Sequence, residues 1–151
     1  MAVEKAGLSD GEQIKTLIDF YASKDKMLAR SLSEIYEHIR DFFVYKDGGI
    51  VAGSCALHFS WGDLAEVRSL AVDPRYANRG VGRALVSACL EEAKAMRVAR
   101  VFTLTSEPEF FRKLGFVSLK KSELPMKIWG ECIYCNKYPK CDEEALVYKL
   151  K

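Results

Sequence analysis

The spacing of apolar residues changes from helical to alternating and back along the chain, which is typical of a mixed α/β fold. Residues 2–7 predict a short first strand. Helical patterns follow over 9–22 and 31–40, and each opens on a Ser-x-x-Glu capping box, in SDGE and in SLSE. Residues 42–73 then form three apolar runs separated by short polar turns, the pattern of an antiparallel meander.

The second half of the chain returns to helical spacing after the meander. The expected elements are a helix over 80–96, a strand over 99–105, a short helix over 106–115 behind a third capping box (SEPE), and strands over 116–119 and 144–150. Because a helix joins the strand at 64–73 to the next strand, these two strands should run parallel or diverge, with a right-handed crossover. The pattern predicts one domain, 1–151, of the α+β (mixed α/β) class, with a mostly antiparallel sheet of about seven strands flanked by four helices.

Composition and charge exclude several classes of protein. The chain has 151 residues, of which 49% are hydrophobic and 29% charged, so a globular domain is expected rather than a disordered one. The net charge of +2 argues against a nucleic-acid partner. No apolar run approaches the ~20 residues of a membrane span, and the first residues lack a signal-peptide pattern. We expect a cytoplasmic protein that acts on a small molecule, with no membrane or nucleic-acid partner.

Three arginines crowd the start of the helix predicted over 80–96, in the segment VDPRYANRGVGRALV. Arg75, Arg79 and Arg83 lie where the helix dipole is already positive, and no acidic residue caps that end. Gly80 and Gly82 would let a ligand approach the first backbone N–H groups closely. This pattern predicts a site for a diphosphate or a 3′-phosphate; the alternative is a glycine-containing helix start with solvated arginines. A Walker A motif and a full G-x-G-x-x-G are both absent.

Two segments resemble motifs of the GNAT acyltransferases. EVRSLAVDPRYANRGVGRALV is similar to the central motif of that family, and FFRKLGF is similar to its F-[FY]-x-x-x-G-F helix. The resemblance covers nearly the whole chain and implies the GNAT fold, with acetyl-CoA as cosubstrate. One departure is Ala77, which stands where the family has Gln or Arg. The residues implied to bind acetyl-CoA are Leu70, Ala71, Val72, Asn78, Arg79, Gly80, Val81, Gly82, Arg83, Ala84, Phe110 and Phe111.

The chemistry implied by this resemblance is the direct attack of an amine on the thioester. The backbone N–H near Leu70 is the implied donor to the thioester oxygen. Strand alternation predicts that positions 66, 68 and 70 share a face. Glu66 is then a base, acting directly or through water, and Arg68 anchors a carboxylate; alternatively, the two form an ordinary cross-strand ion pair at the surface.

The proton for the departing thiolate has no evident source in the family's aromatic helix. Many relatives have a tyrosine where this chain has Phe111. Water or a tail tyrosine, such as Tyr134 or Tyr138, could supply the proton. The thiolate could also leave unassisted, because a thiol pKa near ~8.5 makes it a tolerable leaving group.

The tail at 123–146 resembles the C-terminal segment of short bacterial N-acetylglutamate synthase-like proteins, which consist of a GNAT domain alone. This resemblance implies the α-amine of L-glutamate as acceptor, in the first step of arginine biosynthesis. Arg68, Lys127 and Arg112 are the candidate cations for its two carboxylates, and Lys127 is the preferred contribution of the tail. Alternatives are a GNAT acting on a polyamine, an antibiotic or a protein N-terminus, and a non-catalytic acyl-CoA-binding or metal-sensing regulator. Dimers are common in the family, which leaves both a monomer and a homodimer open, because nothing in these residues settles the oligomeric state.

The same tail carries the spacing C-x₂-C-x₅-C at Cys132, Cys135 and Cys141. Thiolates at this spacing suit zinc, with Asp142 or Glu143 as the fourth ligand. The alternatives are a reduced thiol-rich knuckle or a reversible disulfide between the first two cysteines.

The remaining cysteines and both histidines are interpreted as structural. Cys55 and Cys89 lie within apolar patterns and are expected to be small core residues. His38 and His58 are far from the cysteine cluster in sequence and are interpreted as ordinary packed or exposed residues rather than metal ligands.

Overall fold

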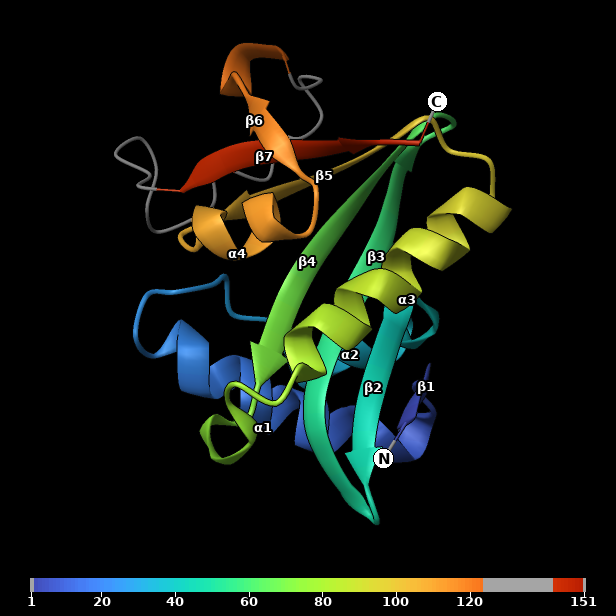
Figure 1. Cartoon of the computed structure of the whole chain (residues 1–151). Coiled ribbons are helices and arrows are strands. Elements are labelled where there is room, and N and C mark those ends of the chain that lie inside the picture. Colours follow the sequence, from blue (N-terminus) through green and yellow to red (C-terminus); the bar gives the residue numbers. More distant parts are fainter. Residues whose placement is uncertain (1, 124–142, 151) are drawn as a thin grey trace.

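A computed structural model describes residues 2–123 and 143–150, and within them a seven-stranded sheet carries helices on both faces (Figure 1). The strand order is β1-β2-β3-β4-β5-β7-β6, and every neighbouring pair is antiparallel except β4 and β5. The predicted fold class and order of elements are confirmed. The strands are β1 (Ala2–Lys5), β2 (Phe42–Asp47), β3 (Ile50–Trp61), β4 (Leu64–Val72), β5 (Arg100–Thr105), β6 (Val117–Leu119) and β7 (Glu144–Lys149). The helices are α1 (Gly11–Ala22), α2 (Leu32–Glu37), α3 (Val81–Ala95) and α4 (Pro108–Lys113).

The helices divide the core into two layers, one on each face of the sheet. Helix α3 crosses one face, where Leu85 and Cys89 pack against Val67 of β4. Helices α1 and α2 cover the other face, where Ile14 and Ile35 belong to a second buried cluster. Each strand in the centre of the sheet therefore presents alternate side chains to different helices.

Strands β4 and β5 are paired only at one end. Their parallel ladder covers Leu64–Glu66 against Arg100–Phe102, and the two strands then separate (Figure 1). The Thr103 hydroxyl donates to the Val67 carbonyl at 2.9 Å just beyond the last paired residues. The expectation of parallel or diverging strands is confirmed, because the two strands are parallel at their paired end and diverge beyond it. The rest of β4 has no ladder with β5 in the described residues, so one of its edges is open there.

A β-bulge interrupts β4 within this open stretch. The register with β3 pairs Ala56 with Arg68 but Ser54 with Ala71, so β4 carries one extra residue between these pairs. Ser69 takes up the extra length with φ of +56°. Alternation is broken at this point, and Leu70 packs with the α3 cluster while Ala71 packs with the α1–α2 cluster. The prediction that positions 66, 68 and 70 share a face is therefore wrong for position 70.

One of the three predicted capping boxes forms. The Ser31 hydroxyl accepts the Glu34 N–H at 3.1 Å, and the Glu34 carboxylate accepts the Ser31 N–H at 3.1 Å. The SDGE box is wrong, because a 3₁₀ turn (Leu8–Asp10) precedes α1 and the Asp10 carboxylate accepts a backbone N–H three residues earlier. The SEPE box is wrong too, because the Thr105 hydroxyl accepts the Glu107 N–H at 2.9 Å in its place.

The second predicted helix is also shorter than expected. Helix α2 ends at Glu37 rather than near residue 40, and a 3₁₀ turn (Ile39–Asp41) follows it. This turn leads directly into β2. Among the described residues, the helices lack the length and apolarity needed to cross a bilayer.

Candidate active site

A cavity of about 570 Å³ opens where β4 parts from β5. Its walls come from the bulged end of β4, the start of α3, the start of α4 and the loop after α1. Most residues predicted to bind a ligand lie on these walls. They are Arg68, Leu70, Val72, Asn78, Gly80, Val81, Gly82, Arg83, Phe110 and Phe111.

The start of α3 exposes backbone amides toward this cavity. Gly80 is the N-cap in the left-handed region, with φ of +78° and no side-chain cap. The first hydrogen bond of the helix runs from the Ala84 N–H to the Gly80 carbonyl at 3.0 Å, so Ala84 already has a partner. The N–H groups of 81–83 have none inside the helix. A Cβ at Gly82 would lie 3.1 Å from the Phe110 ring, so any side chain there would crowd this ring, which lines the cavity.

The three arginines of this junction differ in their partners. Arg75 forms a 2.8 Å ion pair with Asp73, which raises the pKa of the guanidinium and lowers the pKa of the Asp73 carboxyl. Arg79 precedes the helix and stacks on the Tyr76 ring at 5.4 Å, so it is not part of the helix that carries Arg83. Neither Arg79 nor Arg83 pairs with a carboxylate among the described residues; Arg83 lines the cavity, and Arg79 lies between the lining residues Asn78 and Gly80 in the chain.

The open edge of β4 forms the opposite wall of the cavity. Leu70 and Val72 line it, whereas Ala71 points into the core on the other face of the sheet. The Val72 carbonyl accepts the Tyr21 hydroxyl from α1. Burial, with a smaller contribution from the Asp73 charge, raises the pKa of Tyr21. The β4 backbone that follows the bulge therefore borders the cavity as an unladdered edge, where an extended ligand can add like a strand.

Glu66 and Arg68 form a largely buried pair along β4. Arg68 Nη1 lies 3.8 Å from Glu66 Oε1, and the two side chains are 12% and 10% exposed. Both precede the bulge, so they share the face of α1 and α2, and Arg68 also lines the cavity. The alternative interpretation, an ordinary cross-strand pair at the surface, is therefore wrong, because the pair is largely buried and lies along one strand. A buried guanidinium that reaches a cavity can hold a carboxylate there.

Among the described residues predicted for the site, five do not line the cavity: Glu66, Ala71, Arg79, Ala84 and Arg112. Arg112 is exposed and pairs with Glu109 and with Glu144, the latter at 2.7 Å, and it donates to the Ser118 hydroxyl at 3.1 Å. Phe111 is almost fully buried, and its ring also forms part of the core. Cys55 and Cys89 are confirmed as core residues, with their sulfurs 3.8 Å apart. Lys127, Tyr134, Tyr138, Cys132, Cys135 and Cys141 lie outside the described residues.

Sequence reasoning missed three contributors from the end of α1 and the loop that follows it. Tyr21, Lys26 and Met27 all line the cavity. Tyr21 fits the apolar face of a helix, and nothing in its spacing indicates that its hydroxyl reaches β4. Lys26 and Met27 lie in a segment without periodicity, and only the tertiary fold places them at the cavity.

This arrangement suits a long anionic ligand with an extended arm. A helix start with unbonded amides and two arginines binds phosphates, and the neighbouring strand edge binds the arm. Residues 38–118, more than half of the chain, match the family model of the acetyltransferase (GNAT) domain. The chain belongs to this family and is an acetyl-CoA-dependent N-acetyltransferase of GNAT type. The predicted family, fold and enzyme class are confirmed.

The chain is similar to two relatives and to one solved structure of this class. The chain is 42% identical to an uncharacterized N-acetyltransferase of Chlorobaculum tepidum, over 98% of the chain and 96% of that protein. It is 37% identical to an amino-acid acetyltransferase of Mycobacterium tuberculosis, over 90% of the chain and 78% of that protein. The structure is also similar to N-acetylglutamate synthase from Neisseria gonorrhoeae complexed with coenzyme A and N-acetyl-glutamate. There the TM-score is 0.87 at 26% identity, over 99% of this chain and 35% of that chain.

Proposed function

We propose that this enzyme transfers the acetyl group of acetyl-CoA to the α-amine of L-glutamate. The observation that carries the proposal is the buried Arg68 on the cavity wall, because an acceptor with carboxylates needs a fixed cation close to the reacting atoms. The relatives named amino-acid acetyltransferase and N-acetylglutamate synthase support an amino-acid acceptor. Arginine biosynthesis is the corresponding pathway.

The donor half of the site lies on the α3 side. In the proposed complex, the amides of 81–83 and the side chains of Arg79 and Arg83 hold the pyrophosphate of acetyl-CoA. The pantetheine arm follows the open edge of β4 at 70–72, adding as a strand would. The thioester then reaches the bulge, where the Leu70 N–H donates to its carbonyl oxygen and stabilises the negative charge of the transition state.

The acceptor half lies on the side of α1 and α2. Arg68 holds a carboxylate of glutamate, and Glu66 accepts the proton of the ammonium group, directly or through water. The neutral amine attacks the thioester carbon, a C–N bond forms and the C–S bond breaks. The new amide nitrogen loses its remaining extra proton to water, and the coenzyme A thiolate leaves and takes a proton from water or from a hydroxyl near the cavity. Tyr21 offers one such hydroxyl, because it lines the cavity and donates to the Val72 carbonyl of β4.

A thiol-release assay with a panel of acceptors tests the proposal. L-Glutamate should give the highest kcat/KM, and acetylated glutamate should be identified by mass spectrometry. L-Glutamine removes the side-chain charge, glutarate removes the amine and spermidine reverses the acceptor charge; each should be a poorer substrate or none. Turnover of spermidine above glutamate would reject the acceptor. Absence of acetyl-CoA binding in calorimetry would reject the donor site itself.

A further inference from the structure

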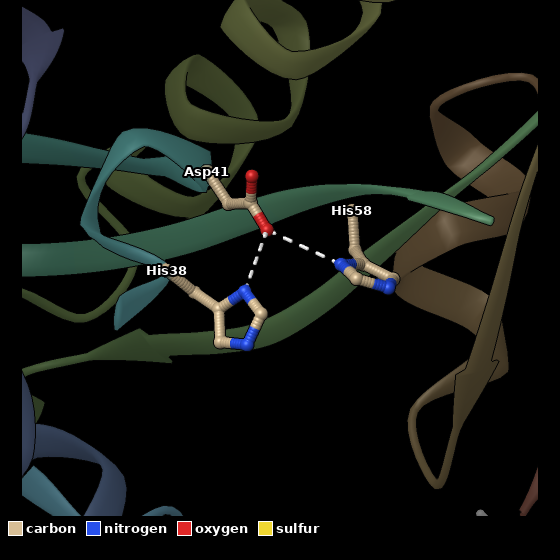
Figure 2. A group of neighbouring side chains, drawn as sticks. All are labelled: His38, Asp41 and His58. Atoms are coloured by element: carbon tan, nitrogen blue, oxygen red, sulfur yellow. Dashed lines mark hydrogen bonds and ion pairs between the residues drawn. The ribbon is translucent and has the colours of Figure 1, made fainter. Parts of the chain in front are cut away.

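Both histidines of the chain meet at one carboxylate. His38 follows α2, Asp41 ends the 3₁₀ turn before β2, and His58 lies within β3. Figure 2 shows the Asp41 carboxylate between the two imidazole rings. Its Oδ2 lies 3.2 Å from His58 Nδ1 and 3.8 Å from His38 Nδ1, and the ring centroids are 5.9 Å apart. Three residues from different elements thus direct nitrogen and oxygen atoms at one point.

The chemistry of this set is that of a transition-metal site. We propose that His38, Asp41 and His58 bind a divalent cation of the zinc type. One ligand atom from each residue lies within 4.8 Å of the others. Zinc bonds to imidazole nitrogen and carboxylate oxygen are about 2.0–2.2 Å long, which places ligand atoms roughly 3.3–3.6 Å apart. Small side-chain rotations close this difference, and His38, with 47% of its side chain exposed, is free to make one.

The charged residues near Asp41 are compatible with a bound cation. Arg30 and Arg68 line the same small cavity as Asp41; Arg30 pairs with Glu34 at 3.6 Å and Arg68 pairs with Glu66 at 3.8 Å, so each of these cations has an acid of its own. These pairs therefore cancel much of the repulsion that a metal ion would meet.

A small cavity provides room for a further ligand. It has a volume of about 20 Å³ and borders His38 and Asp41, with Arg30 and Arg68 also on its wall, while His58 is not part of its lining. A cavity of roughly 10–15 Å³ or more holds a water molecule. Three protein ligands and one water would give a four-coordinate zinc site, in which the water occupies the fourth position.

The proposed site uses none of the cysteines of the predicted cluster, and it is independent of the proposed acceptor. It lies close to the acceptor side, because His58 is the β3 partner of Glu66 in the strand register. Bound metal would tie the turn before β2 to the centre of the sheet. Metal binding and glutamate turnover are nevertheless measured separately, so either proposal can fail without the other.

The two histidines make the test direct. In untagged protein, the imidazole region of a ¹H–¹⁵N spectrum contains only His38 and His58. The parent for this experiment carries Ser in place of Cys132, Cys135 and Cys141, so that thiolates of the tail cannot bind the metal. One equivalent of Zn²⁺ should shift the signals of both rings together and raise the melting temperature. Shifts of neither ring, or of His38 alone, would overturn the proposal.

Ligand variants and a second metal complete the experiment. His58→Gln and Asp41→Asn should each weaken Zn²⁺ binding by roughly tenfold or more in calorimetry, since even changes to groups that only support ligands cost about 10–100-fold. Binding as tight as in the parent would refute the site. If a variant does not fold, Co²⁺ added to the parent decides the matter. A nitrogen and oxygen site gives d–d absorption without thiolate charge transfer, and absence of the d–d bands at saturating Co²⁺ refutes the proposal.

Discussion

Replacement of Arg68 by glutamine separates the two roles assigned to its guanidinium. The side chain pairs with the buried Glu66 and also lines the cavity. Arg68→Gln keeps a similar length and hydrogen-bonding capacity but removes the charge. The change should therefore affect both the stability of the fold and the binding of the acceptor.

The two effects differ in size and in readout. Loss of one partner from a buried ion pair costs about 3 kcal/mol or more, because the other charge is left uncompensated. A domain with roughly 5–15 kcal/mol of stability should survive this loss. A charge-assisted hydrogen bond to glutamate contributes about 1.5–3 kcal/mol, so the KM for glutamate should rise roughly 10- to 150-fold. The KM for acetyl-CoA should not change, because the proposed phosphate site lies across the sheet at α3.

Steady-state kinetics and urea unfolding measure these effects on one preparation. Coenzyme A release should be followed by chromatography, because the chain has five cysteines, three of them outside the buried pair Cys55 and Cys89, and protein thiols interfere with thiol reagents. Arg112→Gln is the matched control: Arg112 is the other described arginine proposed for the acceptor, but it pairs with Glu109 and Glu144 outside the cavity lining. Its KM for glutamate should equal that of the wild type. An unchanged KM in folded Arg68→Gln, or a raised KM in Arg112→Gln, would refute the assignment.

Three further predictions concern the start of α3 and the cap of α2. Gly82→Ala places a methyl group beside a phenylalanine ring of α4 and should raise the KM for acetyl-CoA about tenfold, a loss of about 1.4 kcal/mol, without lowering the urea midpoint. Arg83→Gln should weaken coenzyme A binding in calorimetry and reduce its salt dependence, whereas Arg75→Gln should not, because Arg75 is already paired. The hydrogen bond from the Ser31 N–H lowers the pKa of Glu34 from its ordinary 4.5, so the stability that Glu34 contributes is present above pH 4.5 and is lost as the pH falls through the folded pKa. Urea unfolding of Glu34→Gln should lack this acid-dependent loss.

Element order and fold class were predictable because they follow from apolar spacing. The meander at 42–73 and the helix after it have strong, regular periods, and both are confirmed. Helix starts were less predictable, because a Ser-x-x-Glu pattern is only one way to satisfy the first N–H groups. Before α1 the Asp10 carboxylate accepts the Gly7 N–H, and before α4 the Thr105 hydroxyl accepts the Glu107 N–H, so other side chains cap these turns.

The site was predictable in its donor half and not in its acceptor half. The glycines and arginines at the start of α3 are close together in the sequence, so the sequence alone indicated that they form one site. The bulge at Ser69 has no signature in EVRSLAV, because serine is not a residue that marks a positive φ. The meeting of His38 and His58 depends on the register of β3 beside the turn before β2, which no local pattern records.

The bulge explains how two substrates can react through a sheet that separates them. Before it, Glu66 and Arg68 face α1 and α2; after it, Leu70 faces α3. Without the extra residue, Leu70 would follow Arg68 onto the acceptor face, and the edge at 70–72 would turn its side chains away from the phosphate site. Because β5 has already parted from β4 at this level, the gap is open from both faces. One residue of extra length therefore places the proposed thioester contact between the proposed donor and acceptor sites.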